Sequence, residues 1–570
     1  MKPKIIVPVI LFLLISGCKD GSKENNKSEE INIENVDELF ENTPKGKKIT
    51  DRDFSINIIN AYNDIFIDSM AMESYISSRQ LADKKIALRI RSFYNARNYQ
   101  YAWFTSKGLT EQTRFFWNQY DYAVTHLKDS TLINSYFYKK AEKFLNQEQL
   151  KISTNDTNII NAEFGFTEHF IRYINSTYEK GYVKRKEQEK FIPVKKMDPL
   201  IMADSLINKK HKDDKYYEDV NEMYAGLKKN LALYYELAKK GGWLTIPSIK
   251  KSIKIGTSDT VISVIKNRLQ KTMDMAGNDS TSFYNDTLEI AIKKFQKRHG
   301  YKADGIITPA LIKEMNISAS KRLMEILLNM DRMRWIPQKP TGNLIIVNIP
   351  EFMLHVMDGK NKVFDMVVVV GRIGNNTMMF NGDLNQIVFS PYWNIPPSII
   401  EKEIMPSIKK DPGYLARKNM EKIGGGIRQK PGPGNALGKV KFIFPNSFNM
   451  YFHDTPSKSL FGQDKRAFSH GCIRLSEPQK MAEWLLKNDP GWDKQKIVSA
   501  MNQTSEKSVK LKEAIPVFII YYTAWVDEEG LLNFRDDVYQ HDKELIEKMF
   551  IYDLKSSIQV VKMDNLSVKN

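Results

Sequence analysis

The sequence predicts a multidomain protein with a mainly helical region, a small helical unit, and a β-rich domain that carries a long insertion. A change of periodicity along the chain predicts this division. Apolar residues recur at helical spacing up to about residue 334, whereas short apolar runs of strand character begin at Leu344. The 570 residues allow three or four domains, and 42% hydrophobic residues are enough to form real cores.

Residues 1–17 have the layout of a secretory signal peptide. Lys2 and Lys4 precede an apolar run from Ile5 to Ile15, and Ser16-Gly17-Cys18 follows it. The run is too short to cross a bilayer, which takes about 20 residues. Residues 18–50 are polar and charged, so they cannot bury a core and are predicted to form a flexible tether.

The segment Leu14–Cys18 resembles a bacterial lipobox. The resemblance implies that Cys18 is lipidated and becomes the mature N-terminus. The protein would then be anchored by lipid in the cell envelope, facing the periplasm. A lysine directly after the cysteine, here Lys19, resembles the pattern of lipoproteins that are sorted to the outer membrane rather than the inner one. The alternative is an ordinary cleaved signal with an incidental cysteine.

Lys and Arg outnumber Asp and Glu by 85 to 68, which gives a net charge of +17. This balance favours anionic partners, such as nucleic acid, anionic lipid or the carboxylate-rich bacterial cell wall. The export signal and the spread of basic residues along the chain argue against nucleic acid.

Residues 51–257 are predicted to be helical. Ile86, Ile90, Phe93 and Arg97 form one stripe at helical spacing, and a second stripe ends at the helix stop Gly241-Gly242. The second stripe comprises Leu227, Leu231, Tyr234, Tyr235 and Ala238. No catalytic pattern accompanies either stripe.

Residues 258–316 form a separate unit. An amphipathic helix over 291–300 ends in a glycine, with Phe295 predicted in the core and His299 at the helix-end surface. A turn at Asp304-Gly305 leads to a further helix with Thr308 as N-cap and Pro309 as its first residue. Residues 317–340 then hold a helix, from about Ser318 to Arg334, that is expected to return to the helical region.

The β-rich domain spans 341–524, with its first strands in three apolar runs and a turn at Asp358-Gly359. The long insertion, residues 391–437, contains aromatic residues and a predicted helix, which favour a functional lid over disorder. Ser476 and Gln479 form an expected capping box for the next helix. Residues 525–570 are predicted to be a C-terminal extension.

Cys472 is the only cysteine besides Cys18, and it lies in Ser469-His470-Gly471-Cys472, after a separate His453. A single thiol kept in an exported protein with histidines nearby is a candidate nucleophile, since exported thiols normally pair. A small buried side chain is one alternative. Zinc binding by the thiol and both histidines is another, but no Cys-x-x-Cys or His-x-x-x-His pattern supports it, so no metal is expected.

The spacing of His453 and Ser469-His470-Gly471-Cys472 resembles the signature of YkuD-type L,D-transpeptidases, with Arg474 where the family often has Asn. Residues around Trp103 and Trp243 resemble the scaffold domain of the large YcbB-type members. The unit 258–316 is similar to the three-helix peptidoglycan-binding domain. The resemblance implies a helical scaffold, that small domain, and a β-rich catalytic domain with a capping insertion.

The resemblance also implies the roles of the site residues. The Cys472 thiolate would attack a peptidoglycan stem peptide, with His453 as base and acid and its tautomer held by the Asp454 carbonyl. Gly471 and Cys472 amides, near His470, would form the oxyanion site. The expected substrate contacts are Arg474, Ser469, Trp393 and Tyr392; the two aromatics could instead be core residues, and Arg474 could form a structural salt bridge.

The expected reaction joins a donor tetrapeptide to an acceptor stem in a 3→3 crosslink, without a cofactor, and carbapenem-type inhibitors would acylate Cys472. Hydrolysis of the acyl-enzyme, exchange with a free D-amino acid, and attachment of an envelope protein remain alternatives. A non-catalytic peptidoglycan anchor is an alternative of another class.

Overall fold

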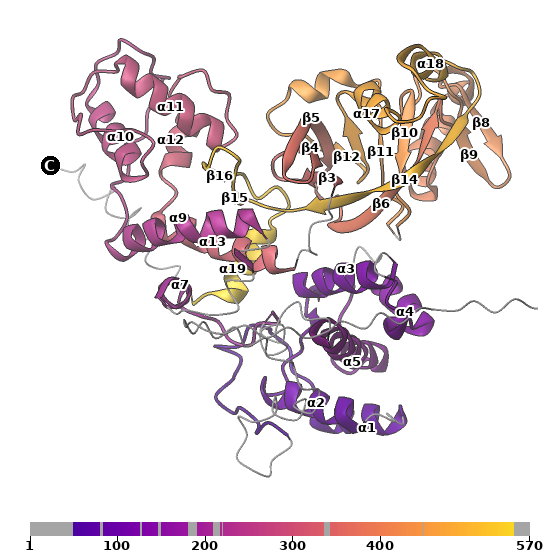
Figure 1. Cartoon of the computed structure of the whole chain (residues 1–570), viewed down its shortest axis with the longest axis horizontal. Coiled ribbons are helices and arrows are strands. Elements are labelled where there is room, and N and C mark those ends of the chain that lie inside the picture. The colour runs from indigo at the N-terminus through magenta and orange to yellow at the C-terminus, as the bar shows by residue number, and fades with distance from the viewer. Residues whose placement is uncertain are drawn as a thin grey trace, which may run out of the picture. The chain divides into compact units, whose positions relative to one another are not determined.

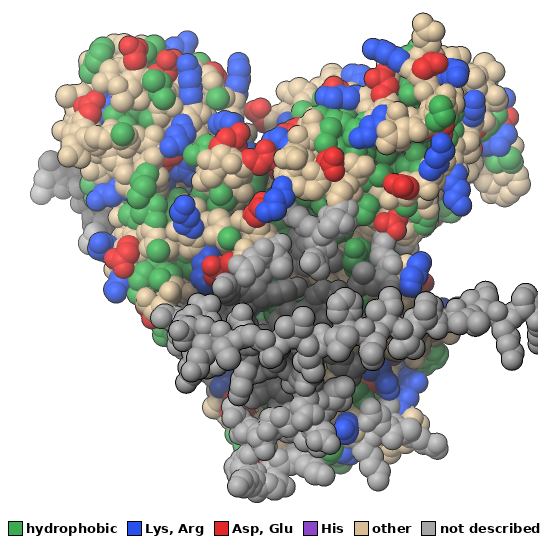
Figure 2. Space-filling model, viewed as in Figure 1, with side chains coloured by type: hydrophobic (Ala, Val, Ile, Leu, Met, Phe, Trp, Pro, Cys, Tyr) green, Lys and Arg blue, Asp and Glu red, His purple; other side chains and the backbone are tan. Residues whose placement is uncertain are grey.

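The computed structural model describes residues 49–551, except 80–83, 126–127, 146–149, 180–190, 209–216, 219–220, 336–341 and 447. The predicted signal peptide, Cys18 and almost all of the tether lie outside the described residues. The described residues from Asp51 onward form one compact unit. Within the described part, no helix is both long and apolar enough to cross a membrane. On the face shown in Figure 2, Lys and Arg are scattered among Asp and Glu, not gathered in one stripe.

The helical region is built on aromatic packing. Trp103 is fully buried and contacts Phe116 and Phe170, with ring centroids 5.2 Å apart in both pairs. Ile86 and Ile90 of the predicted stripe are buried as expected. The helices are α1 (Ser69–Ser78), α2 (Lys84–Asn95), α3 (Glu111–Thr125), α4 (Ser135–Leu145), α5 (Thr157–Glu179), α7 (Pro199–Asn208) and α9 (Glu222–Lys239), with a short hairpin of β1 (Phe104–Thr105) and β2 (Gly108–Leu109) and a 3₁₀ turn at Ser130–Leu132.

Three helices, α10 (Thr260–Lys271), α11 (Asp286–Arg298) and α12 (Pro309–Met315), gather in one small bundle (Figure 1) with its own core. The predicted N-cap is confirmed, since Thr308 Oγ1 accepts the Leu311 N–H at 3.2 Å. The prediction that His299 is a surface residue is wrong. Its ring is buried between Phe295 and Phe534, because the distant C-terminal segment covers this end of α11.

The β-rich domain is a sheet in the order β12-β5-β13-β11-β10-β6-β14-β3-β4 that closes through the pairing of β4 with β5. The described strands therefore form an eight-stranded barrel, with β12 at its side. The strands are β3 (Asn343–Asn348), β4 (Met353–Asp358), β5 (Asn361–Gly371), β6 (Phe380–Phe389), β10 (Val440–Ile443), β11 (Tyr451–His453), β12 (Ala467–Ser469), β13 (Ile473–Leu475) and β14 (Lys507–Ile520).

The insertion has its own small core of Ile395, Ile404 and Ile427. Trp393 packs against this core, so the tryptophan belongs to the insertion's own packing rather than to the barrel. The elements are β7 (Trp393–Asn394), α14 (Pro397–Ile399), a π-helix η4 (Ile400–Ile404), α15 (Met405–Lys410), α16 (Tyr414–Arg417), β8 (Met420–Ile423) and β9 (Gly426–Gln429).

The predicted capping box after the catalytic motif is wrong. The helix α17 (Pro478–Leu485) begins after Glu477, which makes no side-chain cap. The Ser476 N–H instead donates to the Val367 carbonyl at 3.1 Å, so Ser476 still belongs to the strand edge. The Gln479 amide donates to Glu483 within the helix. A second short helix, α18 (Lys494–Ala500), follows.

The helix α13 (Ala319–Arg334) is buried over almost its whole length and packs against α9, α7 and α19 (His541–Met549). Its Arg332 side chain, only 1% exposed, donates to Glu111 of α3 and to Asp542 of α19, at 2.6 Å in each case. The C-terminal segment also adds β15 (Ala524–Val526) and β16 (Leu532–Phe534), which pair with each other. One cation therefore joins the helical region to the end of the described chain.

We expect Arg332→Met to destabilise the protein by about 3–5 kcal/mol, because it leaves two carboxylates buried without their cation. Burial already raises the pKa of Asp542, and the Arg332 charge opposes that rise. Thermal unfolding would show the loss as a lower midpoint. Lys321→Met on the same helix is the control, since Lys321 is exposed. Equal midpoints for the two variants would contradict the prediction.

Candidate active site

Cys472 lies in the turn between β12 and β13, inside the barrel wall. The strand β12 pairs with β5, and β13 lies between β5 and β11, with His453 opposite Arg474. Gly471 has φ +116°, a backbone conformation that a side chain would strain. The neighbouring strands therefore hold the Ser469–Cys472 turn on both sides.

His453 and Tyr451 are two residues apart on β11, so their side chains point to the same face of the sheet. Their ring centroids are 5.7 Å apart. The Cys472 thiol donates to the Asn449 carbonyl, with Sγ 3.9 Å from the oxygen, and the nearby Tyr451 acts to lower the pKa of the thiol. The strand register thus brings Cys472 and His453, the two predicted catalytic residues, to one face. Tyr451 was not predicted, although its spacing from His453 could have identified it.

The His453 ring is buried, and its Nδ1 lies 2.5 Å from the Asp454 carbonyl oxygen. Because a carbonyl can only accept, Nδ1 carries the proton and Nε2 keeps its lone pair. Burial, reinforced by the Arg474 charge, lowers the pKa of His453 to about 3. His453 is therefore neutral at physiological pH, and Nε2 can accept a proton. The contact with Asp454 is the one predicted for the tautomer.

The Asp454 carboxylate fixes the turn beyond His453. It accepts the Lys439 and Thr455 N–H groups, at 2.9 and 2.7 Å, and the Lys458 ammonium at 2.6 Å. A Cβ at Gly438 would lie 2.4 Å from this carboxyl group, so only glycine permits the close approach.

Burial raises the pKa of the Cys472 thiol, and the Tyr451 hydrogen bonds and the Arg474 charge oppose the rise only in part. The resting pair is therefore a neutral thiol beside a neutral imidazole, not a thiolate–imidazolium pair. Proton transfer then has to accompany attack on a substrate.

Ser469 shapes the turn that carries the thiol. Its hydroxyl donates to the Cys472 carbonyl at 2.6 Å and accepts the Gly471 N–H at 3.1 Å. The Gly471 amide, predicted as an oxyanion donor, is therefore occupied within the turn. Ser469 is only 2% exposed, so in this conformation it offers little surface to a substrate. The Cys472 amide is the remaining backbone candidate.

A second network reaches this turn from Tyr539, beyond the barrel. The Tyr539 hydroxyl donates to the Gly371 carbonyl at 2.7 Å and accepts the Thr377 N–H at 3.2 Å. The Thr377 hydroxyl donates to the Gly471 carbonyl at 2.7 Å and accepts the Gly371 N–H at 2.8 Å. Neither Tyr539 nor Thr377 was predicted as part of the site.

Arg474 and His470 flank the thiol differently. The Arg474 Nε is buried without a hydrogen-bond partner among the described residues, and desolvation lowers the pKa of its guanidinium. His470 points to the insertion, where Nε2 lies 2.9 Å from Glu403 Oε1 on η4. The insertion therefore contacts the catalytic turn directly.

Tyr392 lies at the base of the insertion. Its N–H donates to Glu506 at 2.9 Å, and the Arg428 guanidinium lies 4.1 Å from its ring centroid. Within the described part of the chain, no cluster of three or more His, Cys, Asp or Glu side chains could hold a metal ion.

Three family matches follow one another along the chain. Residues 89–231 match the scaffold domain, 259–315 the peptidoglycan-binding domain, and 342–497 the L,D-transpeptidase catalytic domain, YkuD. Residues 342–497 are an L,D-transpeptidase catalytic domain. The resemblance seen in the sequence is confirmed for all three parts, as are the helical scaffold and the β-rich fold that it implied.

A Haemophilus influenzae protein whose name assigns it provisionally to the L,D-transpeptidases is 30% identical over 254 residues, 41% of this chain. The chain spans about half the length of that relative. Solved L,D-transpeptidases from Stackebrandtia nassauensis and Xylanimonas cellulosilytica are 15% and 12% identical, each over 48% of this chain. The alignments cover 96% and 100% of those chains, with TM-scores of 0.21 and 0.16.

The raised pKa of the Cys472 thiol predicts how its alkylation depends on pH. In a Cys18→Ser background, where Cys472 is the only thiol, we expect the iodoacetamide rate to rise about tenfold per pH unit from about pH 6 to 8, because only the thiolate reacts. Mass spectrometry of timed samples would measure the rate. A rate that is already constant below pH 7 would instead show a preformed thiolate–imidazolium pair.

Proposed function

We propose that this protein is an L,D-transpeptidase that forms 3→3 peptidoglycan crosslinks through an acyl-enzyme on Cys472, in cell-wall biogenesis. The observation that carries the proposal is the state of His453. It is neutral, its Nδ1 proton is committed to the Asp454 carbonyl, and it shares a face of the sheet with Cys472. A base in this state can activate a thiol that is itself neutral at rest.

In the proposed reaction, His453 takes the Cys472 proton as sulfur attacks the carbonyl of the third stem residue, a diamino acid such as meso-diaminopimelate. The bond to the terminal D-alanine breaks, and His453 returns the proton to the departing amine. The side-chain amine of a second stem then attacks the thioester and gives its proton to His453, which reprotonates the thiol. The Cys472 N–H is the proposed donor for the developing oxyanion, and the Tyr451 hydroxyl, which interacts with the Cys472 sulfur, is a second candidate.

Arg474 is the proposed receptor for a substrate carboxylate. A guanidinium with a buried, unpartnered Nε gains hydrogen bonds when a carboxylate arrives, and a fork of two such bonds also fixes orientation. No ion pair of Arg474 with another described residue supports the structural salt bridge that was the alternative.

Three outcomes of the same acyl-enzyme compete with crosslinking: hydrolysis to a tripeptide, exchange with a free D-amino acid, and attachment of an envelope protein. We infer that the insertion favours transfer over hydrolysis, because Glu403 contacts His470 of the catalytic turn and an insertion held there would exclude water. A purely anchoring protein would have no use for a buried, neutral histidine on the strand next to the one that follows Cys472.

We expect Cys472→Ala to lower the rate of crosslink formation from disaccharide-tetrapeptide by at least about 10³-fold. Without the nucleophile, only substrate binding and stabilisation of the oxyanion still lower the barrier. It should also abolish the carbapenem adduct. Chromatography and mass spectrometry of the products would measure both. A persistent adduct on the folded variant would rule out Cys472 as the nucleophile. If the wild-type chain yields only tripeptide, its reaction is hydrolysis by a carboxypeptidase and not crosslinking.

Tyr539 and Thr377 are proposed to position the oxyanion donor. The carbonyl of Gly471 and the N–H of Cys472 belong to one trans peptide and point in opposite directions. Because the Thr377 hydroxyl holds that carbonyl, it also aims the Cys472 N–H away from Thr377. Tyr539 in turn holds the Thr377 and Gly371 backbones, so the C-terminal segment sets the orientation of the donor.

We expect Tyr539→Phe to reduce turnover by about 10- to 100-fold, less than the roughly 10²- to 10³-fold cost of removing an oxyanion donor, with KM little changed. Alkylation of Cys472 should stay unchanged, because the thiol itself is not affected. Tyr522→Phe is the matched control, since the Tyr522 hydroxyl is buried without a hydrogen-bond partner among the described residues. Thr377→Ser, which keeps the hydroxyl, should retain activity, whereas Thr377→Val should not. Equal kinetics for the two tyrosine variants would refute the positioning role.

The protein is further proposed to be a lipoprotein on the periplasmic side of the envelope, anchored through Cys18, with the outer membrane favoured by Lys19. We expect Cys18→Ser to move the chain from the membrane fraction to the soluble periplasm, with activity in detergent unchanged. Immunoblotting of the fractions checks this. A variant that still sediments with membranes would exclude the lipid anchor.

A further inference from the structure

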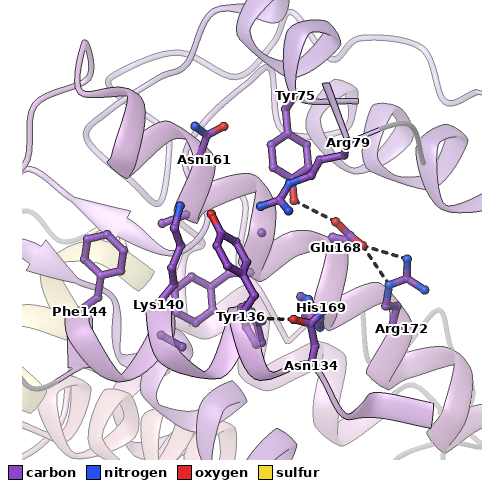
Figure 3. Close-up of a pocket in the computed structure, with 15 residues that line it drawn as sticks. Tyr75, Arg79, Asn134, Tyr136, Lys140, Phe144, Asn161, Glu168, His169 and Arg172 are labelled. Carbon is purple, nitrogen blue, oxygen red and sulfur yellow. Dashed lines mark hydrogen bonds and ion pairs between the residues drawn. The ribbon is translucent and has the colours of Figure 1, made fainter. Parts of the chain in front are cut away.

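A hollow of about 260 Å³ lies in the scaffold between α1, α4 and α5 (Figure 3). Its polar side chains come from all three helices, so folding alone brings them together. The residues around it are Tyr75, Arg79, Asn134, Tyr136, Phe137 and Lys140, with Gly165, Glu168, His169 and Arg172 on α5.

The described lining carries three cations and one carboxylate. Glu168 accepts from Arg172 at 2.9 Å and from the Tyr75 hydroxyl at 2.9 Å, so the Arg172 charge is matched within the wall. Among the described residues, Arg79 and Lys140 form no ion pair. The hollow therefore presents two cations whose charge no described neighbour balances.

These two cations converge on one ring. The Arg79 guanidinium and the Lys140 ammonium both lie 5.0 Å from the Tyr136 ring centroid. The Lys140 hydrogen bond to the Tyr136 hydroxyl, aided by the charges of Lys140 and Arg79, lowers the pKa of Tyr136. Both cations line the hollow, so an anion bound in it would be attracted by two positive charges.

The floor of the hollow is apolar and uncharged. Phe137 and Phe166 are buried there, and the His169 ring stacks on Phe137 with centroids 3.8 Å apart. Burial, followed by the charges of Arg172 and Arg79, lowers the pKa of His169 to about 3, so it is neutral. A cationic rim over an apolar floor suits a ligand with a carboxylate and a short aliphatic group.

We propose that this hollow is a second binding site, apart from Cys472, for the terminal D-alanine of a peptidoglycan stem peptide. Arg79 and Lys140 would hold its carboxylate, and the methyl group would lie on the floor. The volume is slightly below the range of about 300–1,000 Å³ typical of small-molecule sites, which suits a chain end. The identity of the peptide rests on the proposed function, whereas the preference for a carboxylate does not.

The test is calorimetric titration of disaccharide-tetrapeptide into the full chain carrying Cys472→Ala, in detergent. Arg79→Gln with Lys140→Gln removes the charge, and Gly165→Leu fills the space. A Cβ at Gly165 meets only the Tyr75 hydroxyl, at an ordinary 3.8 Å, so the helix tolerates a side chain there. Lys139→Gln is the matched control, an exposed lysine of α4 that does not line the hollow.

We expect the double variant and Gly165→Leu each to weaken the binding of disaccharide-tetrapeptide at one of its sites by about tenfold or more. Hydrogen bonds to charged groups are stronger than those between neutral groups. Lys139→Gln should bind like the parent chain. A tetrapeptide with a C-terminal amide, or inorganic phosphate, should bind the parent at least about tenfold more weakly, because neither offers the terminal carboxylate.

Unchanged binding by both pocket variants would overturn the site, and phosphate binding as tight as peptide binding would overturn the peptide assignment. Failure of the proposed function has a different signature. A wild-type chain that forms no product, while the pocket variants still lose peptide binding, would leave the second site standing.

Discussion

The buried guanidinium of Arg332 is the contact on which the assembly of this chain depends. It reaches α3 of the scaffold through Glu111 and α19 through Asp542, which lie more than 200 residues away in opposite directions along the chain. A cation in this position must keep both partners, because removal of either leaves a buried charge uncompensated. Its pairing with Asp542 also secures the segment in which Tyr539 lies, and through Tyr539 the catalytic turn.

Burial, rather than a charged partner, sets the chemistry of the site. Desolvation lowers the pKa of His453 and raises that of Cys472, so both groups are driven to their neutral forms. The Arg474 charge adds to the effect on the histidine and opposes the effect on the thiol. This arrangement keeps the Cys472 thiol protonated in the absence of substrate and leaves its activation to His453 and the bound substrate.

The residue types of the site could be predicted from the sequence, because the motif around Cys472 is dense and His453 lies at a constrained distance from it. The same holds for the helix cap at Thr308, which is local. The prediction for His299 was wrong because it depended on packing between segments that are distant in the sequence. His299 is covered by Phe534, more than 200 residues later, and no local pattern could show this.

Within the catalytic turn, prediction failed for a different reason. Whether the Gly471 amide is free depends on the rotamer of the Ser469 hydroxyl, which spacing does not determine. Tyr451 could have been found, since strand periodicity places it beside His453. Tyr539 could not, because its contact with Gly371 joins segments 168 residues apart.

The contact of Tyr539 with the catalytic turn has a consequence for biosynthesis. The nucleophile is synthesised before the residue that completes its surroundings, so a nascent or truncated chain can hold a folded barrel with a misaligned donor. Full acylating power would then appear only after the segment that carries Tyr539 has docked.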